Sequence, residues 1–355
     1  PGTGLHPLRG QNNVQGACDM GSMTHEFPGY RHVSNNEVRA IFEKEWGTSL
    51  DNEPGLRIPN MFDSAIDGSF KGIFIHGEDI AQSDPNTHHV ERALTSMDIV
   101  VVQDLFLNET AAFAHVFLPG TSFLEKDGTF TNAERRINRV RKVMREKQGM
   151  AEWDIVCRLA TAFGYPMSYG SSSEIMDEIA RMTPTFTGVS FDRLDELGSI
   201  QWPCDDQHPT GTPTMHIDDF TRGKGRFMLT EFVPTAERSN RNFPLILTTG
   251  RILAHYNVGA QTRRTDNVAW HPEDVLEIHP SDAEMRGIKT GQKVSLASRV
   301  GATTLTAKVS DRMPPGVVYT TFHHPATGAN VITTENSDWA TNCPEYKVTA
   351  VQVTT

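Results

Sequence analysis

The apolar positions in the first half of the chain come in short blocks that alternate with helical patterns. Residues 72–76, 98–103 and 115–119 are compact apolar runs rich in β-branched and aromatic side chains, and residues 87–97 follow a helical period. Strands that alternate with helices indicate parallel βαβ units, whose ligands bind at the carboxyl ends of the strands. We therefore predict an α/β fold with a Rossmann-like parallel sheet here.

Two further helices and a long irregular stretch follow. Residues 151–163 and 172–182 have helical patterns, and the serines of residues 170–173 are typical of a linker and helix cap. Residues 198–242 are rich in turn-forming residues and have little periodicity, so we interpret them as a connection that wraps across the molecule.

The remainder of the chain consists mostly of alternating or β-branched runs. Six strands are predicted, at residues 244–249, 275–278, 293–298, 303–309, 316–320 and 348–353. A six-stranded β-barrel is the simplest arrangement for them. The predicted domains are residues 1–165 for the parallel-sheet portion, 166–242 for the helical and irregular connection, and 243–355 for the barrel.

The opening segment, residues 7–21, is polar and rich in glycine and amide side chains. Arg9 offers a planar fork of donors that binds a carboxylate through two parallel hydrogen bonds, and Gln11 adds a neutral amide beside it. Such a loop suits a small anion. Chemistry alone leaves an equal alternative, a surface loop with an incidental arginine.

The literal sequence of this segment resembles a known family. It is similar to the segment that carries the substrate arginine in molybdenum- or tungsten-dependent formate dehydrogenases of the molybdopterin oxidoreductase family. The resemblance continues through residues 24–30, which look like the NAD-linked branch, and reaches residues 344–347. It implies that Arg9 and Gln11 are catalytic, and that formate is oxidised to CO2 at a bis-molybdopterin guanine dinucleotide centre holding Mo or W.

The same resemblance implies partners and a place in the cell. Electrons pass through iron–sulfur clusters to NAD, and those clusters and NAD or FMN are expected in a missing part or in iron–sulfur/flavin subunits. The chain looks like the C-terminal portion of a catalytic subunit, inactive alone and cytoplasmic. Two rivals stay open: an oxyanion reductase of the nitrate type, and a non-catalytic scaffold like the large iron–sulfur subunit of respiratory NADH–quinone oxidoreductase.

Polar residues follow the first two predicted strands. Gly77, Asp79 and Ser83 come after residues 72–76, and Gln103 ends the next strand. A carboxylate at a strand end accepts N–H groups from a guanine edge, and a glycine lets a ligand approach the backbone. Ordinary turn chemistry explains the same residues. The resemblance implies that all four contact a pterin guanine dinucleotide, Ser83 least firmly.

The barrel region carries a second group of candidates. Arg251, His255 and Tyr256 follow its first strand, and a cation with an imidazole suits a pyrophosphate and a pterin. A lone histidine is more often structural, and Ile252 replaces an acidic residue found in some relatives. The resemblance adds the cofactor-facing residues Phe322, Asn330, Tyr346 and Lys347.

Composition and charge argue against several classes of binding site. The chain is 37% hydrophobic and 22% charged, as is ordinary for a globular protein. Its net charge of −11 argues against a nucleic-acid or anionic-membrane surface, although residues 135–142 form a basic stretch that suits a cofactor, a subunit contact or a solvated face. The four cysteines form no Cys-x-x-Cys pair, and no apolar run reaches the roughly 18 residues of a membrane span, so we predict no metal site and no membrane span.

Overall fold

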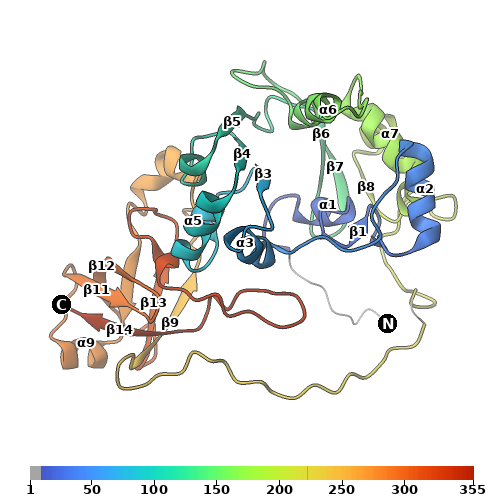
Figure 1. The fold of residues 1–355 in the computed structure, drawn as a ribbon. Helices are drawn as coiled ribbons and strands as arrows, with labels where there is room; N and C mark the ends of the chain where they lie inside the picture. The colour runs from blue at the N-terminus through green and yellow to red at the C-terminus, as the bar shows by residue number, and fades with distance from the viewer. Residues whose placement is uncertain (1–8, 222) are drawn as a thin grey trace. The chain divides into compact units, whose positions relative to one another are not determined.

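The chain divides into two compact units, each built from two segments (Figure 1). A computed structural model describes residues 9–221 and 223–355, so Pro7 and Leu8 of the opening motif lie outside the described residues. The first unit contains residues up to Leu56 together with Gly120–Leu229, and the second contains Arg57–Pro119 together with Thr230–Thr355. The division predicted from the sequence followed chain order, whereas each unit here interleaves two stretches of chain. We describe each unit by itself.

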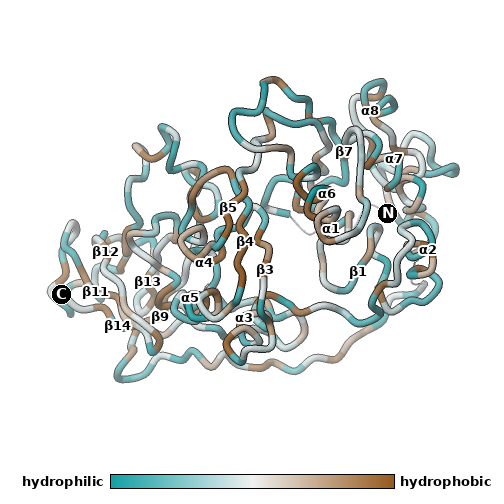
Figure 2. Tube along the Cα trace, turned by 45° about the horizontal axis from the view of Figure 1, so that its top comes forward, coloured by the Kyte–Doolittle hydropathy of each residue, from teal (hydrophilic) through white to brown (hydrophobic). Residues whose placement is uncertain are grey.

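A three-stranded parallel sheet forms one half of the second unit. Its strands β3 (Gly72–His76), β4 (Ile99–Asp104) and β5 (Val116–Pro119) lie in that order, as the βαβ pattern predicts. The helices α3 (Ile58–Ile66) and α5 (Thr87–Ser96) pack their apolar sides with the buried strand residues into one core. Figure 2 shows the hydrophobic colour concentrated on β4 and β5. Short helices α4 (Ile80–Ser83) and η1 (Thr110–Phe113) follow β3 and β4.

The other half of the second unit is a closed six-stranded barrel. Its strands are β9 (Leu245–Gly250), β10 (Val275–Ile278), β11 (Lys293–Ala297), β12 (Ala302–Val309), β13 (Val317–Thr321) and β14 (Thr349–Thr354). They close in the order β10-β12-β11-β14-β9-β13 around a core of buried leucine, isoleucine and valine. The barrel prediction is confirmed, with strand ends displaced by at most one residue. Helix α9 (Pro280–Arg286) and the turns η3 (Thr262–Arg264), η4 (Asp266–Ala269) and η5 (Ala329–Val331) lie in its connections.

The first unit packs helices around a small antiparallel sheet. Its strands are β6 (Gly128–Thr131), β7 (Arg136–Val140) and β8 (Ser199–Gln201), with a short β1 (Glu26–Phe27) and β2 (Arg31–His32) hairpin apart from them. Its helices are α1 (Val14–Asp19), α2 (Asn36–Trp46), α6 (Glu152–Ala162), α7 (Ser172–Met182), η2 (Pro184–Phe186) and α8 (Phe191–Leu197). The predicted helices α6 and α7 are confirmed, and the side chain of Ser171 caps α7. Strand β8 lies inside the stretch predicted to be irregular, which is a correction.

The basic stretch on β7 has partners within its own unit. The Arg139 guanidinium lies 3.6 Å from the centre of the Phe191 ring and pairs with Asp195 at 3.1 Å, and Arg135 donates to the Trp202 carbonyl. These contacts make the arginines part of the folded unit's packing. In the part of the chain that the structure describes, no helix is long and apolar enough to cross a membrane.

Candidate cofactor-binding site

Gly77 and Gln103 lie together where β3 and β4 end, as predicted. The Gly77 N–H donates to the Gln103 carbonyl at 2.8 Å, and the φ of Gly77 is +66°. A Cβ added at Gly77 meets no atom within 4 Å, so the space beside it is open. The Gln103 side chain is fully buried, yet its nitrogen and its oxygen have no hydrogen-bond partner among the described residues. Because buried amides are nearly always hydrogen-bonded, this side chain needs a further polar partner, such as an ordered water or a ligand atom.

Asp79 is buried at the start of α4 and has one carboxylate oxygen engaged. Its Oδ1 accepts the Thr110 backbone N–H at 2.9 Å and the Thr110 hydroxyl at 2.7 Å. Its Oδ2 is buried and has no partner in the part of the chain that the structure describes. Asp79 is predicted to accept N–H groups from a guanine edge, and because Thr110 already donates to Oδ1, Oδ2 is the oxygen that remains for this role.

Three further carboxyl groups surround these strand ends, which we call the strand tips (residues 77–84 and 103–104). Burial raises the pKa of Glu78, and the Asp79 and Asp104 charges add to this, while a 2.7 Å hydrogen bond from Ser83 opposes it. Burial and then the Glu78 charge raise the pKa of Asp84 to about 7. Burial likewise raises the pKa of Asp104. The strand tips therefore attract N–H donors and repel phosphate groups.

Two cations lie close together at one end of the barrel. The Arg251 guanidinium lies 5.1 Å from the centre of the Phe322 ring and donates to the Asn257 side chain at 3.2 Å. The Lys347 ammonium donates to the Thr249 carbonyl at 2.5 Å. Burial, and then the Arg251 charge, lower the pKa of Lys347. Two neighbouring cations favour an anion between them, which makes this end of the barrel suited to phosphate groups.

We call residues 251–257 and 322–330 the barrel loops, and hydrogen bonds connect the second of them to the strand tips. Asn330 donates from its amide to the Gln82 carbonyl at 2.8 Å and to the Ser83 carbonyl at 3.1 Å. The Gln82 amide donates to the Phe322 carbonyl at 3.2 Å, and the Tyr346 hydroxyl donates to the Ser83 carbonyl at 3.2 Å. The structure therefore brings together the two groups of predicted site residues in the second unit, and Ser83, Asn330 and Tyr346 do this through backbone contacts.

His255 and Tyr256 differ in their surroundings. His255 is buried, with Nε2 2.9 Å from the His271 carbonyl and Nδ1 3.0 Å from the Thr262 hydroxyl. Both ring nitrogens are thus engaged within the protein, which points to a role in shaping the loop. Tyr256 is 47% exposed, so its ring is accessible from solvent.

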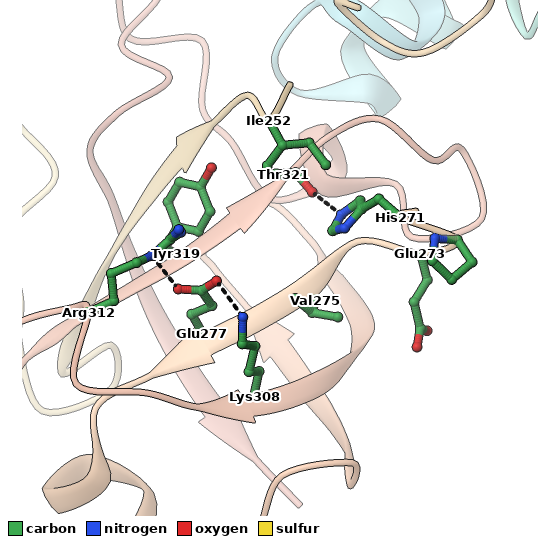
Figure 3. A pocket seen from close by; sticks show the side chains of 10 residues that line it. Ile252, His271, Glu273, Val275, Glu277, Lys308, Arg312, Tyr319 and Thr321 are labelled. Atoms are coloured by element: carbon green, nitrogen blue, oxygen red, sulfur yellow. Dashed lines mark hydrogen bonds and ion pairs between the residues drawn. The ribbon is translucent and has the colours of Figure 1, made fainter. Parts of the chain in front are cut away.

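Two cavities border the barrel loops. One, of about 290 Å³, is lined by Gln82, Phe322 and Asn330, and the buried Gln82 side-chain oxygen has no partner among the described residues. The other, of about 360 Å³, lies against the barrel wall (Figure 3). There Glu277 is paired with Arg312 at 2.8 Å and with Lys308 at 3.5 Å, so its charge is already balanced.

The opening segment belongs to the first unit, where Arg9 and Gln11 are exposed. Helix α1 begins directly after them, and its Gln15 amide donates to Asp19 at 2.7 Å. Asp19 is fully buried and also accepts the Tyr30 hydroxyl at 2.8 Å. Burial raises the pKa of Asp19, whereas its hydrogen bonds and the Arg9 charge lower it. A buried carboxyl group thus sits within electrostatic reach of Arg9.

Sequence reasoning missed Asp19, Thr110 and Asp274. Gln15 and Asp19 are four residues apart on one helix, a spacing that allows their contact to be anticipated. The partners of Thr110 and Asp274 come from distant parts of the chain, and no local pattern signals them.

Comparison with known proteins agrees with this geometry. Residues 4–162 match the family model of molybdopterin oxidoreductases, and residues 245–350 match that of the molydopterin dinucleotide binding domain. Together the two matches span about three quarters of the chain. The chain is therefore similar to molybdopterin oxidoreductases in residues 4–162 and to their dinucleotide binding domain in the barrel region.

The chain is also similar to two archaeal proteins along almost its whole length. It is 42% identical to the F420-dependent formate dehydrogenase 1 subunit alpha of Methanococcus maripaludis and 41% identical to the F420-dependent formate dehydrogenase subunit alpha of Methanocaldococcus jannaschii. Each match covers 99% of this chain and 53% of the relative, so the chain spans about half the length of these curated relatives.

A solved structure supports the fold. Acetylene hydratase from Pelobacter acetylenicus matches with a TM-score of 0.69 at 16% identity, over 90% of this chain and 49% of the hydratase. At that identity the likeness concerns the fold alone.

Proposed function

We propose that this chain is part of the catalytic subunit of a cytoplasmic formate dehydrogenase, which oxidises formate to CO2. The observation that carries the proposal is the similarity over 99% of the chain to two alpha subunits that are named formate dehydrogenases. The Arg9 motif supports the same substrate, because a guanidinium fork matches a carboxylate.

The strand tips fit the guanine end of a molybdopterin guanine dinucleotide. The unpartnered Gln103 amide offers a donor and an acceptor, and the Asp79 Oδ2 offers an acceptor for a guanine N–H. The open space beside Gly77 allows a ligand to approach the backbone. These are the features expected of a protein site whose polar partners come from the ligand.

The barrel loops fit the rest of the dinucleotide. Arg251 and Lys347 would hold its phosphates, and the Phe322 and Tyr256 rings would border the pterin. When bound as a pair with Mo or W, the molybdopterin groups supply the redox chemistry of the reaction. The remaining predicted residues contribute by fixing the loops, as their backbone contacts indicate.

Arg9 and Gln11 act on the substrate in this proposal. Formate carries its charge on two oxygens, so a two-pronged guanidinium contact fixes the direction of its C–H bond. The Gln11 amide donates a further hydrogen bond to the same carboxylate. Oxidation removes two electrons and a proton and leaves neutral CO2, which no longer pairs with Arg9 and departs.

Two observations bear on the identity of the electron acceptor, and they point to different molecules. Residues 24–30 resemble the NAD-linked branch, whereas the two archaeal relatives are named F420-dependent. We propose iron–sulfur and flavin-containing partner subunits as the route in either case. We retain NAD as the acceptor to be tested first.

The test uses a purified catalytic subunit of the relatives' full length that includes this chain. We expect formate to reduce an artificial dye, and the complete complex to reduce NAD but not F420. F420 reduction alone would replace the acceptor and leave formate as the substrate. Nitrate reduction without formate oxidation, or a full-length protein without Mo or W, would contradict the proposal in favour of its rivals.

A further inference from the structure

Asp274 lies directly before β10 and is fully buried. Its carboxylate accepts hydrogen bonds from four neutral donors: the Thr321 hydroxyl, the His323 N–H at 3.1 Å, the His324 N–H at 2.9 Å and the Thr327 hydroxyl at 2.7 Å. All four belong to one stretch of chain at the end of β13. Asp274 therefore fixes the path of the second barrel loop from its first residues to Thr327.

His323 extends this control to the first barrel loop. Its Nδ1 lies 2.5 Å from the Asn257 carbonyl, to which it donates, and its Nε2 accepts the Ile252 N–H at 3.3 Å. A neutral imidazole provides this combination of donor and acceptor, and burial lowers the pKa of His323 to about 4. The His323 backbone thus binds Asp274, while the His323 ring makes hydrogen bonds to both ends of residues 252–257.

The His271 carbonyl joins the two barrel loops a second time. It lies 2.9 Å from His255 Nε2 and 3.0 Å from His324 Nε2, so it accepts one imidazole N–H from each loop. His271 is three residues from Asp274 on the same segment. One short segment before β10 therefore organises both barrel loops.

The barrel itself has no evident need of this buried charge. Its strands close around an apolar core to which Asp274 does not belong. Burying a carboxylate is costly unless donors surround it. Here three of the four donors come from the loop that Asp274 shapes, and the fourth, Thr321, is the residue of β13 directly before it.

We propose that Asp274 is the positioning residue of the barrel loops, which sets the first loop relative to the second through the His323 ring. Its use in cofactor binding rests on the proposed function above. The placement of the loops does not, because the contacts are made within the chain.

Hydrogen exchange of the 355-residue chain tests the proposal. Asp274→Asn keeps the shape but replaces one accepting oxygen by an NH2 group, which faces donors and cannot accept from them, so we expect exchange in peptides 320–328 and 250–258 to accelerate on the order of tenfold. Thr327→Val removes one of the four donors and should accelerate the same peptides less. The Thr327→Val variant also allows the proposal to be tested if the Asp274→Asn variant does not fold.

Asp282→Asn is the matched control. Asp282 is a buried barrel carboxylate that accepts the Gly316 N–H at 2.7 Å. This variant should accelerate exchange near Gly316 and leave both barrel loops unchanged. If Asp274→Asn accelerates exchange only in residues 320–328, the proposed positioning of the first barrel loop by His323 is wrong. If the control accelerates exchange equally in both barrel loops, the effect of Asp274→Asn is general destabilisation.

A binding experiment distinguishes failure of this proposal from failure of the proposed function. GDP, which carries the guanosine and pyrophosphate of the dinucleotide, is titrated against the wild-type chain and Asp274→Asn by calorimetry. Binding that weakens about tenfold in the variant supports both proposals. Exchange as expected with no GDP binding by either protein supports the positioning role and counts against the cofactor site.

Discussion

Asp84 provides a test of the electrostatics at the strand tips. Its folded pKa of about 7 lies well above the ordinary 3.8, because burial and the neighbouring Glu78 charge disfavour its ionised form. Between these two pH values the native state holds a proton that the unfolded chain has released. The free energy of unfolding therefore falls as pH rises from about 4 to about 7, and the loss is complete above that.

Asp84→Asn removes this penalty while keeping the shape of the side chain. Each unit of pKa difference corresponds to about 1.4 kcal/mol, and Glu78 shares the repulsion, so we expect a gain on the order of 2–4 kcal/mol at pH 8. At pH 4, where Asp84 is protonated in the native state, the gain should vanish.

Urea unfolding of the chain at pH 4 and pH 8, followed by circular dichroism, measures the difference. Asp338→Asn is the control of opposite sign, because hydrogen bonds from Thr341 and then Cys343 lower the pKa of the exposed Asp338 to about 2. Its contribution is present above the ordinary pKa and is lost as pH falls through about 2, so this variant should be less stable than wild type at pH 8. An Asp84→Asn variant that is no more stable than wild type at pH 8, or equally stabilised at both pH values, would refute the reasoning.

Three predictions concern the proposed enzyme. Arg9→Lys in the full-length subunit keeps the charge but loses the fork, so kcat/KM for formate should fall on the order of 10²-fold, or about 3 kcal/mol, with metal content unchanged; near-normal kinetics would make Arg9 structural. Asp79→Asn should weaken cofactor binding by roughly 1–3 kcal/mol and lower its occupancy, with activity per bound metal retained, and full metal loading would remove Asp79 from the site. The isolated 355-residue chain should show no formate-dependent dye reduction, and activity would overturn its assignment as one part of the catalytic machinery.

The fold was predictable where a local pattern repeats. Strand β9 (Leu245–Gly250) alternates fully and partly buried residues, and this period together with the β-branched runs of the other strands locates the barrel strands in the sequence. Helix α2 was not predicted, because Phe42 is its one fully buried side chain and the helix therefore shows little apolar periodicity. Strand β8 is three residues long, too short to produce a period.

The position of several candidate residues in the fold was predictable, but their contacts were not. Gly77 and Gln103 lie at strand ends, where parallel sheets bind ligands, and they were found for that reason. Asn330 and Tyr346 were expected at the cofactor, yet they bind the backbone of α4. Such long-range contacts depend on how distant segments pack, and no local pattern encodes them. Asp274 was missed for the same reason.

The guanine nucleotide content of a Gln103→Leu enzyme tests whether the cofactor lies at the strand tips. Leucine has a similar volume and removes both polar atoms that lack a partner among the described residues, so the cofactor-free chain should be at least as stable as wild type. We predict that the wild-type full-length subunit releases about two equivalents of GMP per Mo or W on acid hydrolysis, as a bis-dinucleotide centre requires, and that the variant binds clearly less of both metal and GMP. A variant with wild-type metal and GMP content would contradict the placement of the cofactor at the strand tips.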